Sequence, residues 1–113
     1  MYNKGYIIAV DFDGTLSRAG WPYCGDPNIE LINKLINLRK EGVKVILWSC
    51  RSGIEEQAAV DWCKSYGLEF DAVNQNLPEL VESWGGEDTR KIYADEYWDD
   101  KSVKILFDKE LVS

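Results

Sequence analysis

The sequence predicts an α/β domain, a three-layer α/β/α sandwich in which helices cover both faces of one mainly parallel sheet. Two apolar runs without alternation, Ile7–Val10 and Val43–Trp48, are typical of strands buried on both faces. Segments with helical spacing of apolar residues separate the strands, so right-handed crossovers and parallel pairing are expected. A length of 113 residues allows a single domain, residues 1–113, with one core.

The first strand is followed by a short irregular stretch, Ser17–Gly25, which we interpret as a flap beside the strand end. The first helix is expected over Pro27–Glu41, with Asp26 as its N-cap and Pro27 in its first turn. Gly42 is expected to end this helix, because glycine readily adopts the left-handed conformation found after a last turn.

After the second strand, the pattern Ser52–Glu55 is typical of a capping box and predicts a helix over Gly53–Tyr66. The signals for the later elements are weaker, because their apolar runs are short or interrupted. We expect a strand at Leu68–Val73, a short helix at Leu77–Trp84, a strand at Ile92–Trp98 and a last short strand at Val103–Phe107.

Composition narrows the class of partner and the compartment. The formal net charge of −7 argues against nucleic-acid backbones and anionic membranes as partners. No apolar run is long enough to cross a bilayer, and the segment before the first strand is too short for a signal peptide. The cysteines, Cys24, Cys50 and Cys63, are odd in number and lack CxxC spacing, so we expect reduced thiols and a cytoplasmic protein.

The absence of histidine restricts the chemistry. Catalysis by Ser-His-Asp or Cys-His groups is excluded, and so are nearly all catalytic zinc sites. Acid–base work must therefore fall to carboxylates, lysine or tyrosine.

Two aspartates follow the first strand directly. Side chains alternate along an extended chain, so Asp11 and Asp13 are expected on the same side, before Gly14 turns the chain away. Two like charges about 4 Å apart repel by roughly 4 kcal/mol at an effective dielectric constant near 20. A cation, or a proton on one carboxylate, must offset this repulsion.

Several predicted strands end in polar residues, and the carboxyl ends of parallel strands meet at one edge of a sheet. Carboxylates without histidine suit Mg²⁺ rather than zinc. A hydroxyl, an ammonium and free backbone N–H groups suit a phosphoryl group. The groups expected to meet are the Asp11 and Asp13 carboxylates, the Ser49 hydroxyl, the Lys91 ammonium and the Asp99-Asp100 pair.

The stretch Asp11–Thr15, read as DFDGT, resembles the first motif of phosphatases in the haloacid dehalogenase superfamily. Ser49 after Val-Ile-Leu-Trp resembles the second motif, Lys91 the third, and Asp99-Asp100 the acidic pair of the fourth. The resemblance spans most of the chain and implies a Rossmann-like fold. The superfamily commonly inserts a cap domain, but here the intervals between motifs hold only the flap and one short helical segment, so a capless member is expected.

The resemblance implies a Mg²⁺-dependent phosphatase that hydrolyses a phosphomonoester through an aspartyl-phosphate. Asp11 would be the nucleophile, and Asp13 would protonate the leaving oxygen and then activate water. The metal would be bound by Asp11, by the backbone carbonyl of Asp13 and by Asp99, with Asp100 next in line, directly or through water.

The resemblance also implies that Ser49 and Lys91 hold the phosphoryl oxygens. Arg90 and Lys101 are competing candidates for the cation that faces phosphate. Arg51 is expected either to clamp the substrate phosphate or to form an ion pair with an acid of a helix.

Two other functions are compatible with the same motifs. One is a catalytically silent module that binds phosphate or metal and acts through a partner, and the other is a phosphotransferase to an acceptor other than water. The phosphorylated substrate could be a small molecule or a macromolecule, because no cap restricts the site, and the oligomeric state is left open.

Overall fold

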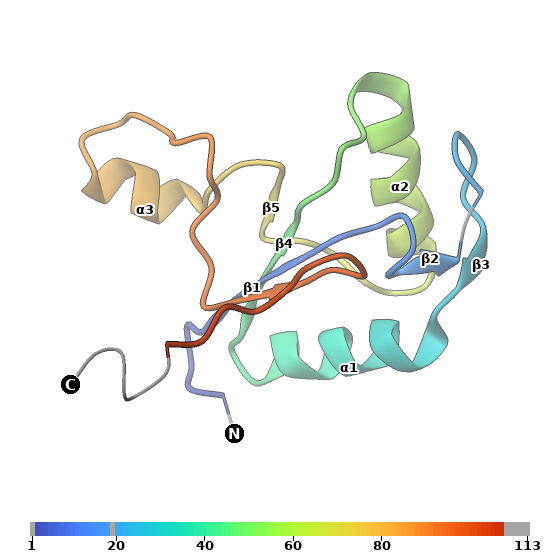
Figure 1. Ribbon diagram of the computed structural model, residues 1–113, viewed down its shortest axis with the longest axis horizontal. Helices are drawn as coiled ribbons and strands as arrows, with labels where there is room; N and C mark the ends of the chain where they lie inside the picture. Colours follow the sequence, from blue (N-terminus) through green and yellow to red (C-terminus); the bar gives the residue numbers. More distant parts are fainter. Residues whose placement is uncertain (1, 19, 108–113) are drawn as a thin grey trace.

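The computed structural model describes residues 2–18 and 20–107. Its central sheet has four strands in the order β5-β4-β1-β6, and every neighbouring pair is parallel (Figure 1). This arrangement confirms the predicted α/β fold with a parallel central sheet. The strands are β1 (Ile7–Val10), β4 (Lys44–Leu47), β5 (Ala72–Val73) and β6 (Glu96–Trp98).

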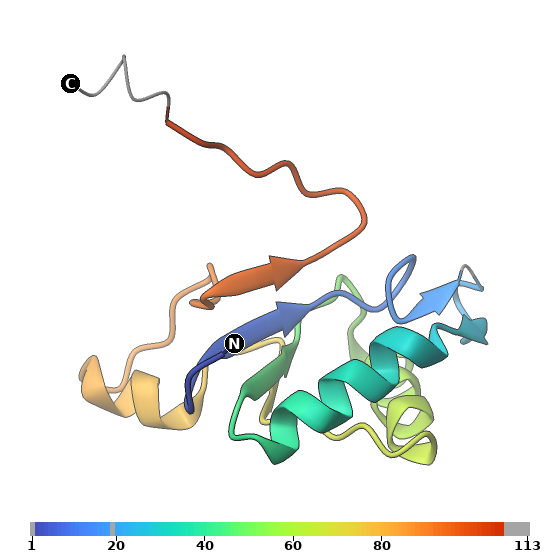
Figure 2. The same cartoon turned by 90° about the horizontal axis from the view of Figure 1, so that it is seen from below.

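Both faces of the sheet are covered, which explains why the apolar residues of the strands do not alternate with polar ones. Helices α1 (Ile29–Lys40) and α2 (Gly53–Ser65) lie together on one side of the sheet (Figure 2). The core on that side includes Ile8 and Val10 of β1. The core on the other side includes Ile7, Ala9 and Ile46 of the sheet, Leu77 before α3 (Pro78–Ser83), and Ile92 and Ala94 of the segment that leads to β6.

The predicted start of the first helix is wrong. Asp26–Pro27 forms a short strand, β3, which pairs antiparallel with β2 (Ser17–Arg18). The helix begins at Ile29 after Asn28, whose side-chain oxygen accepts from the backbone N–H of Leu31 at 3.3 Å. The side-chain amide of Asn28 also donates to a backbone carbonyl of the loop after β1, at 3.2 Å, so this residue joins helix and loop. Because of this tertiary contact, the N-cap is Asn28, two residues later than the predicted Asp26.

The second helix begins and ends close to its predicted bounds, but its capping box is not formed. Ser52 occupies the N-cap position and makes no side-chain hydrogen bond to the helix. The carboxylate of Glu56 instead accepts from the side chain of Asn74, beyond the end of β5, at 2.6 Å. The first turn of α2 is therefore fixed by the neighbouring strand end.

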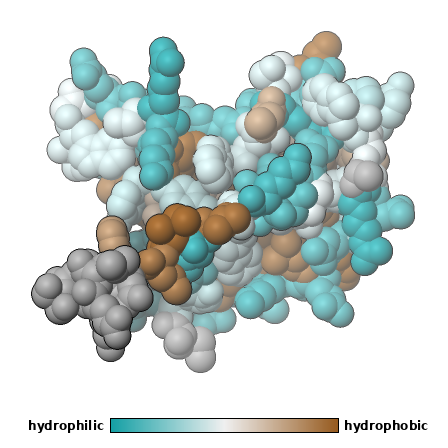
Figure 3. Space-filling model, in the orientation of Figure 1, coloured by the Kyte–Doolittle hydropathy of each residue, from teal (hydrophilic) through white to brown (hydrophobic). Residues whose placement is uncertain are grey.

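The expected last strand at Val103–Phe107 is also wrong, since the described chain contains no strand after β6. Val103, Ile105, Leu106 and Phe107 are between 75% and 82% exposed, because no neighbouring strand pairs with the segment. In Figure 3 it carries a hydrophobic band next to the grey atoms. Within the described residues, no helix is long and apolar enough to cross a membrane.

Candidate active site

The order of the strands places a topological switch point at the carboxyl ends of β1 and β6. The chain runs from β1 to β4 and β5 on one side and then returns to pair β6 with the other side of β1. Open α/β sheets bind ligands at such a reversal. Val10 lies opposite Trp98 in the register, and the backbone N–H of Asp11 donates to the Trp98 carbonyl at 2.9 Å. Asp11 and Asp99 therefore leave adjacent strands side by side.

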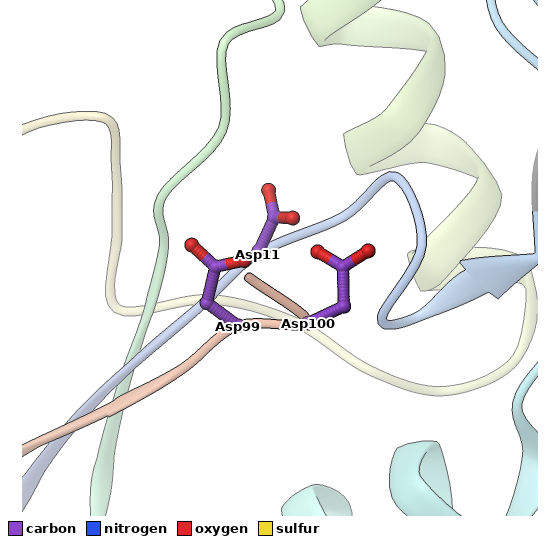
Figure 4. Close-up of side chains that lie close together, drawn as sticks. All are labelled: Asp11, Asp99 and Asp100. Carbon is purple, nitrogen blue, oxygen red and sulfur yellow. The ribbon is translucent and has the colours of Figure 1, made fainter. Parts of the chain in front are cut away.

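Three carboxylates converge at this edge of the sheet. Asp11, Asp99 and Asp100 each offer one oxygen, and these oxygens all lie within 4.8 Å of one another (Figure 4). Asp11 and Asp99 are half-buried and Asp100 is exposed. Asp13 is not part of this cluster, although the alternation of the strand predicts that it should point to the same side.

The cluster is electrostatically unfavourable by itself. Among the residues that the structure places, none of its three carboxylates forms a salt bridge. Burial, together with the charges of Asp99, Asp100 and Asp13, raises the pKa of Asp11 to about 6, although a hydrogen bond from the Phe12 backbone N–H acts in the opposite direction. A divalent cation between the three side chains would remove this repulsion.

The donor set fits a hard divalent cation. Oxygens bound to one Mg²⁺ at about 2.1 Å are at most about 4.2 Å apart, so the three carboxylates need only small side-chain movements to share an ion. Glycine at position 14 allows the loop after β1 to pass close to the Asp100 side chain, because a Cβ there would lie 2.4 Å from Asp100 Oδ2. The φ of +85° at Gly14 also favours glycine.

The side chain of Asp13 is instead held by Arg51. Arg51 Nε donates to Asp13 Oδ2 at 2.8 Å and Nη2 donates to Oδ1 at 2.7 Å, a bidentate ion pair. The hydrogen bonds to Asp13 raise the pKa of Arg51. Of the two roles expected for Arg51, the structure therefore supports an ion pair, with Asp13 rather than with an acid of a helix.

Arg51 also anchors the flap. The residue is 2% exposed, and its guanidinium donates to the carbonyls of Pro22, Tyr23 and Glu55 at 2.7 to 3.3 Å. It lies between the Phe12 and Trp21 rings, 4.7 and 5.1 Å from their centroids. The expected flap therefore packs on a buried cation beside β1.

Ser49 lies two residues past the end of β4, whereas the predicted strand runs to Trp48 and places Ser49 directly after it. Its Oγ accepts from the backbone N–H of Arg51 at 3.0 Å, so the hydroxyl proton can still be donated to a phosphoryl oxygen. The backbone N–H of Ser49 donates to Asn74 Oδ1 at 2.7 Å. The hydroxyl is thus presented from a turn whose backbone is fixed.

The three candidate phosphate-facing cations have different surroundings. Lys91 is exposed and lines a hollow of about 680 Å³ that Asp99 and Trp48 also line, whereas neither Arg90 nor Lys101 lines it. The backbone N–H of Lys101, not its ammonium, approaches the cluster, donating to Asp99 Oδ1 at 3.0 Å. Of the acidic cluster, only Asp99 lines this hollow with Lys91, and Lys104 lines it as well.

The sequence reasoning missed Asn74. This residue directly follows β5 and has a φ of +50°, a conformation that asparagine tolerates better than most residues. The signal that the sequence offers for Asn74 is its position directly after a predicted strand. Its contacts, however, join segments that only the fold brings together.

No family model matches the sequence, and no curated protein matches it. The fold and site define an α/β domain with an acidic cluster at the switch point of a parallel sheet. The structure is similar to that of a conserved protein from Bacteroides thetaiotaomicron, with a TM-score of 0.77 and 36% sequence identity. The match covers 96% of this chain and 87% of that protein, so the chain belongs to the same family as that conserved protein.

Proposed function

We propose that the protein is a Mg²⁺-dependent phosphatase of the haloacid dehalogenase superfamily that hydrolyses a phosphomonoester through an aspartyl-phosphate on Asp11. One observation carries the proposal: carboxylates from the ends of β1 and β6 meet within 4.8 Å at the switch point of the sheet. The order of the four motifs supports it. The three free cysteines of the structure accord with the reducing cytoplasm that we expect for the protein.

Asp11, Asp99 and Asp100 would hold the Mg²⁺, together with the backbone carbonyl of Asp13. When bound, the ion supplies positive charge that lets an anionic phosphate approach an anionic nucleophile. The donor set is suitable because it contains only carboxylate and carbonyl oxygens.

The covalent step uses the carboxylate of Asp11, an oxygen of which attacks phosphorus while the bond to the leaving oxygen breaks. The Ser49 hydroxyl and the Lys91 ammonium donate to the phosphoryl oxygens as negative charge develops on them. Water then attacks the aspartyl-phosphate, which releases inorganic phosphate and restores the Asp11 carboxylate.

Asp13 would give a proton to the leaving oxygen and take one from the attacking water. Both of its oxygens accept from Arg51, so this role requires Asp13 to release at least one of the two contacts when substrate binds. Arg51 would stay in place, because it also donates to three backbone carbonyls, those of Pro22, Tyr23 and Glu55.

The test is phosphate release from p-nitrophenyl phosphate, measured with Mg²⁺ and with a chelator. We expect turnover that depends on Mg²⁺ and that is lost in Asp11→Asn. Turnover on no member of a phosphoester panel would favour the silent binding module. Transfer of phosphate to an added alcohol, detected by product analysis, would instead favour the phosphotransferase.

A further inference from the structure

The carboxamide of Asn74 joins three segments of the molecule. Its Oδ1 accepts from the backbone N–H of Ser49 at 2.7 Å. Its Nδ2 donates to the carbonyl of Arg51 at 3.1 Å and to Glu56 Oε2 at 2.6 Å. The backbone N–H of Asn74 in turn donates to the Leu47 carbonyl at 2.7 Å, which fixes the residue to the end of β4. One side chain thus connects the end of β5, the turn after β4 and the first turn of α2.

The turn that Asn74 holds carries two groups of the proposed site. Ser49 presents the hydroxyl expected to meet a phosphoryl oxygen, and Arg51 holds Asp13. Asn74 itself contacts none of the carboxylates of the cluster, which come from the ends of β1 and β6. Its influence is therefore confined to the phosphoryl half of the site.

The backbone conformation of Asn74 favours asparagine at this position. A φ of +50° is unfavourable for most residues with a side chain. Asparagine tolerates it, and here both amide hydrogens and the carbonyl oxygen of the side chain are used. A residue without the carboxamide would leave the Ser49 N–H and the Arg51 carbonyl without their partner.

We propose that Asn74 is a positioning residue for the phosphoryl-binding turn, fixing the backbone of Ser49–Arg51 from which the Ser49 hydroxyl reaches a phosphoryl oxygen. The inference rests on the proposed function and deepens it. It divides the site into two parts: a metal half on β1 and β6 that does not depend on Asn74, and a phosphoryl half that does.

The experiment compares wild type with Asn74→Gly, which accepts the positive φ but removes the carboxamide. The dissociation constants of Mg²⁺ alone, and of inorganic phosphate at saturating Mg²⁺, are measured by calorimetry. We expect the variant to bind phosphate about 10- to 100-fold more weakly and Mg²⁺ within about twofold of wild type. Hydrogen exchange at the Ser49 amide should accelerate, while exchange at Ile46 in β4 stays slow.

Two controls separate positioning from general loss of stability. Glu56→Gln keeps an oxygen for the Asn74 amide and should leave phosphate affinity within about twofold. Cys63→Ala makes a cavity in the core under α2, where Cys63 is fully buried, and should lower the melting temperature without changing phosphate affinity. If Asn74→Gly does not fold, Asn74→Asp combined with Glu56→Gln takes its place, because the pair keeps the acceptor for Ser49, removes the amide hydrogens for Arg51, and leaves the local charge unchanged with no two carboxylates in contact.

Unchanged phosphate affinity in a folded Asn74 variant would overturn the inference alone, and so would equal losses of Mg²⁺ and phosphate affinity. A wild-type protein that binds neither Mg²⁺ nor phosphate would overturn the proposed function and this inference together. The two failures are distinguished by the wild-type titrations, which are performed first.

Discussion

Asp11 and Asp13 lie two residues apart after the same strand, yet they have opposite surroundings. Asp13 is neutralised by a bidentate contact with the buried Arg51. Asp11 lies beside two further carboxylates, and none of these three forms a salt bridge among the described residues. The ion pair of Asp13 has an evident structural use, since it anchors the flap. The uncompensated cluster has none, and we propose that a bound cation balances its charge.

The two regions also differ in what they contribute to stability. Each pair of carboxylates about 4 Å apart costs roughly 4 kcal/mol at an effective dielectric constant near 20, before exposure to solvent reduces the cost. A fold that keeps such a cluster is less stable than it would be without it, which is typical of functional sites. The following substitutions separate the two regions.

The largest effect is expected on activity. Asp11→Asn should lower kcat/KM for p-nitrophenyl phosphate by at least about 1000-fold, because an amide cannot form the covalent intermediate. The steady-state rate with Mg²⁺ measures this directly. An Asn variant with full activity would exclude Asp11 as the nucleophile.

The next largest effect is on the stability of the paired region. Arg51→Met should lower the free energy of unfolding by about 2 to 4 kcal/mol, less than a fully buried pair would lose, since the Asp13 side chain is 34% exposed. Urea denaturation in the presence of a chelator measures the loss. The matched variant Arg39→Met breaks the Arg39–Asp71 pair, in which the arginine side chain is 30% exposed against 1% for Arg51, and should cost about 1 kcal/mol. Equal losses of unfolding free energy in the two variants would show that the burial of Arg51 does not increase the contribution of its ion pair to stability.

Mg²⁺ should stabilise the protein through the acidic region. At a concentration about 100 times its dissociation constant, the ion should add about 2.7 kcal/mol to the free energy of unfolding, because only the folded state brings the carboxylates together. The melting temperature with and without Mg²⁺ tests this, and Asp99→Asn should reduce the shift. A shift of the same size in that variant would place the ion elsewhere.

A smaller effect is expected on the way in which the stability of the metal-free protein depends on pH. With its pKa raised from 3.8 to about 6, Asp11 binds a proton more tightly in the folded state, so stability falls as pH rises from about 4 to 6. Asp11→Asn should therefore be more stable than wild type by about 1 to 2 kcal/mol at pH 7, a value reduced for partial exposure, and equally stable near pH 4. A destabilised Asn variant at pH 7 would contradict the repulsion.

Sequence patterns located the strands that carry the site because burial on both faces leaves a run such as Ile7–Val10 without polar residues. By the same logic, the sequence predicts that Asp99 lies near Asp11 at one edge of the sheet. The partner of Arg51 and the role of Asn74 could not be read from the chain. The Arg51–Asp13 and Asn74–Arg51 contacts join residues 38 and 23 positions apart, and their geometry arises only when the turn after β4 packs on its neighbours.

Local helix signals were less reliable, for a physical reason. Asp26 and Ser52 are good N-cap residues in isolation, but a cap contributes only about 1 kcal/mol, which a tertiary contact can outweigh. Asn28 replaced Asp26 because its side chain also reaches the loop after β1, and the turn at Ser52 is held by Asn74. The apolar run at Val103–Phe107 formed no strand, since a strand also needs a partner.

The most direct test of the central claim is a crystal structure of the protein grown with Mg²⁺. We expect one ion bound by carboxylate oxygens of Asp11 and Asp99 at about 2.1 Å, with Asp100 bound directly or through water. The contact between Asp13 and Arg51 should remain in the absence of substrate. A well-ordered structure at saturating Mg²⁺ with no ion between Asp11 and Asp99 would contradict the account.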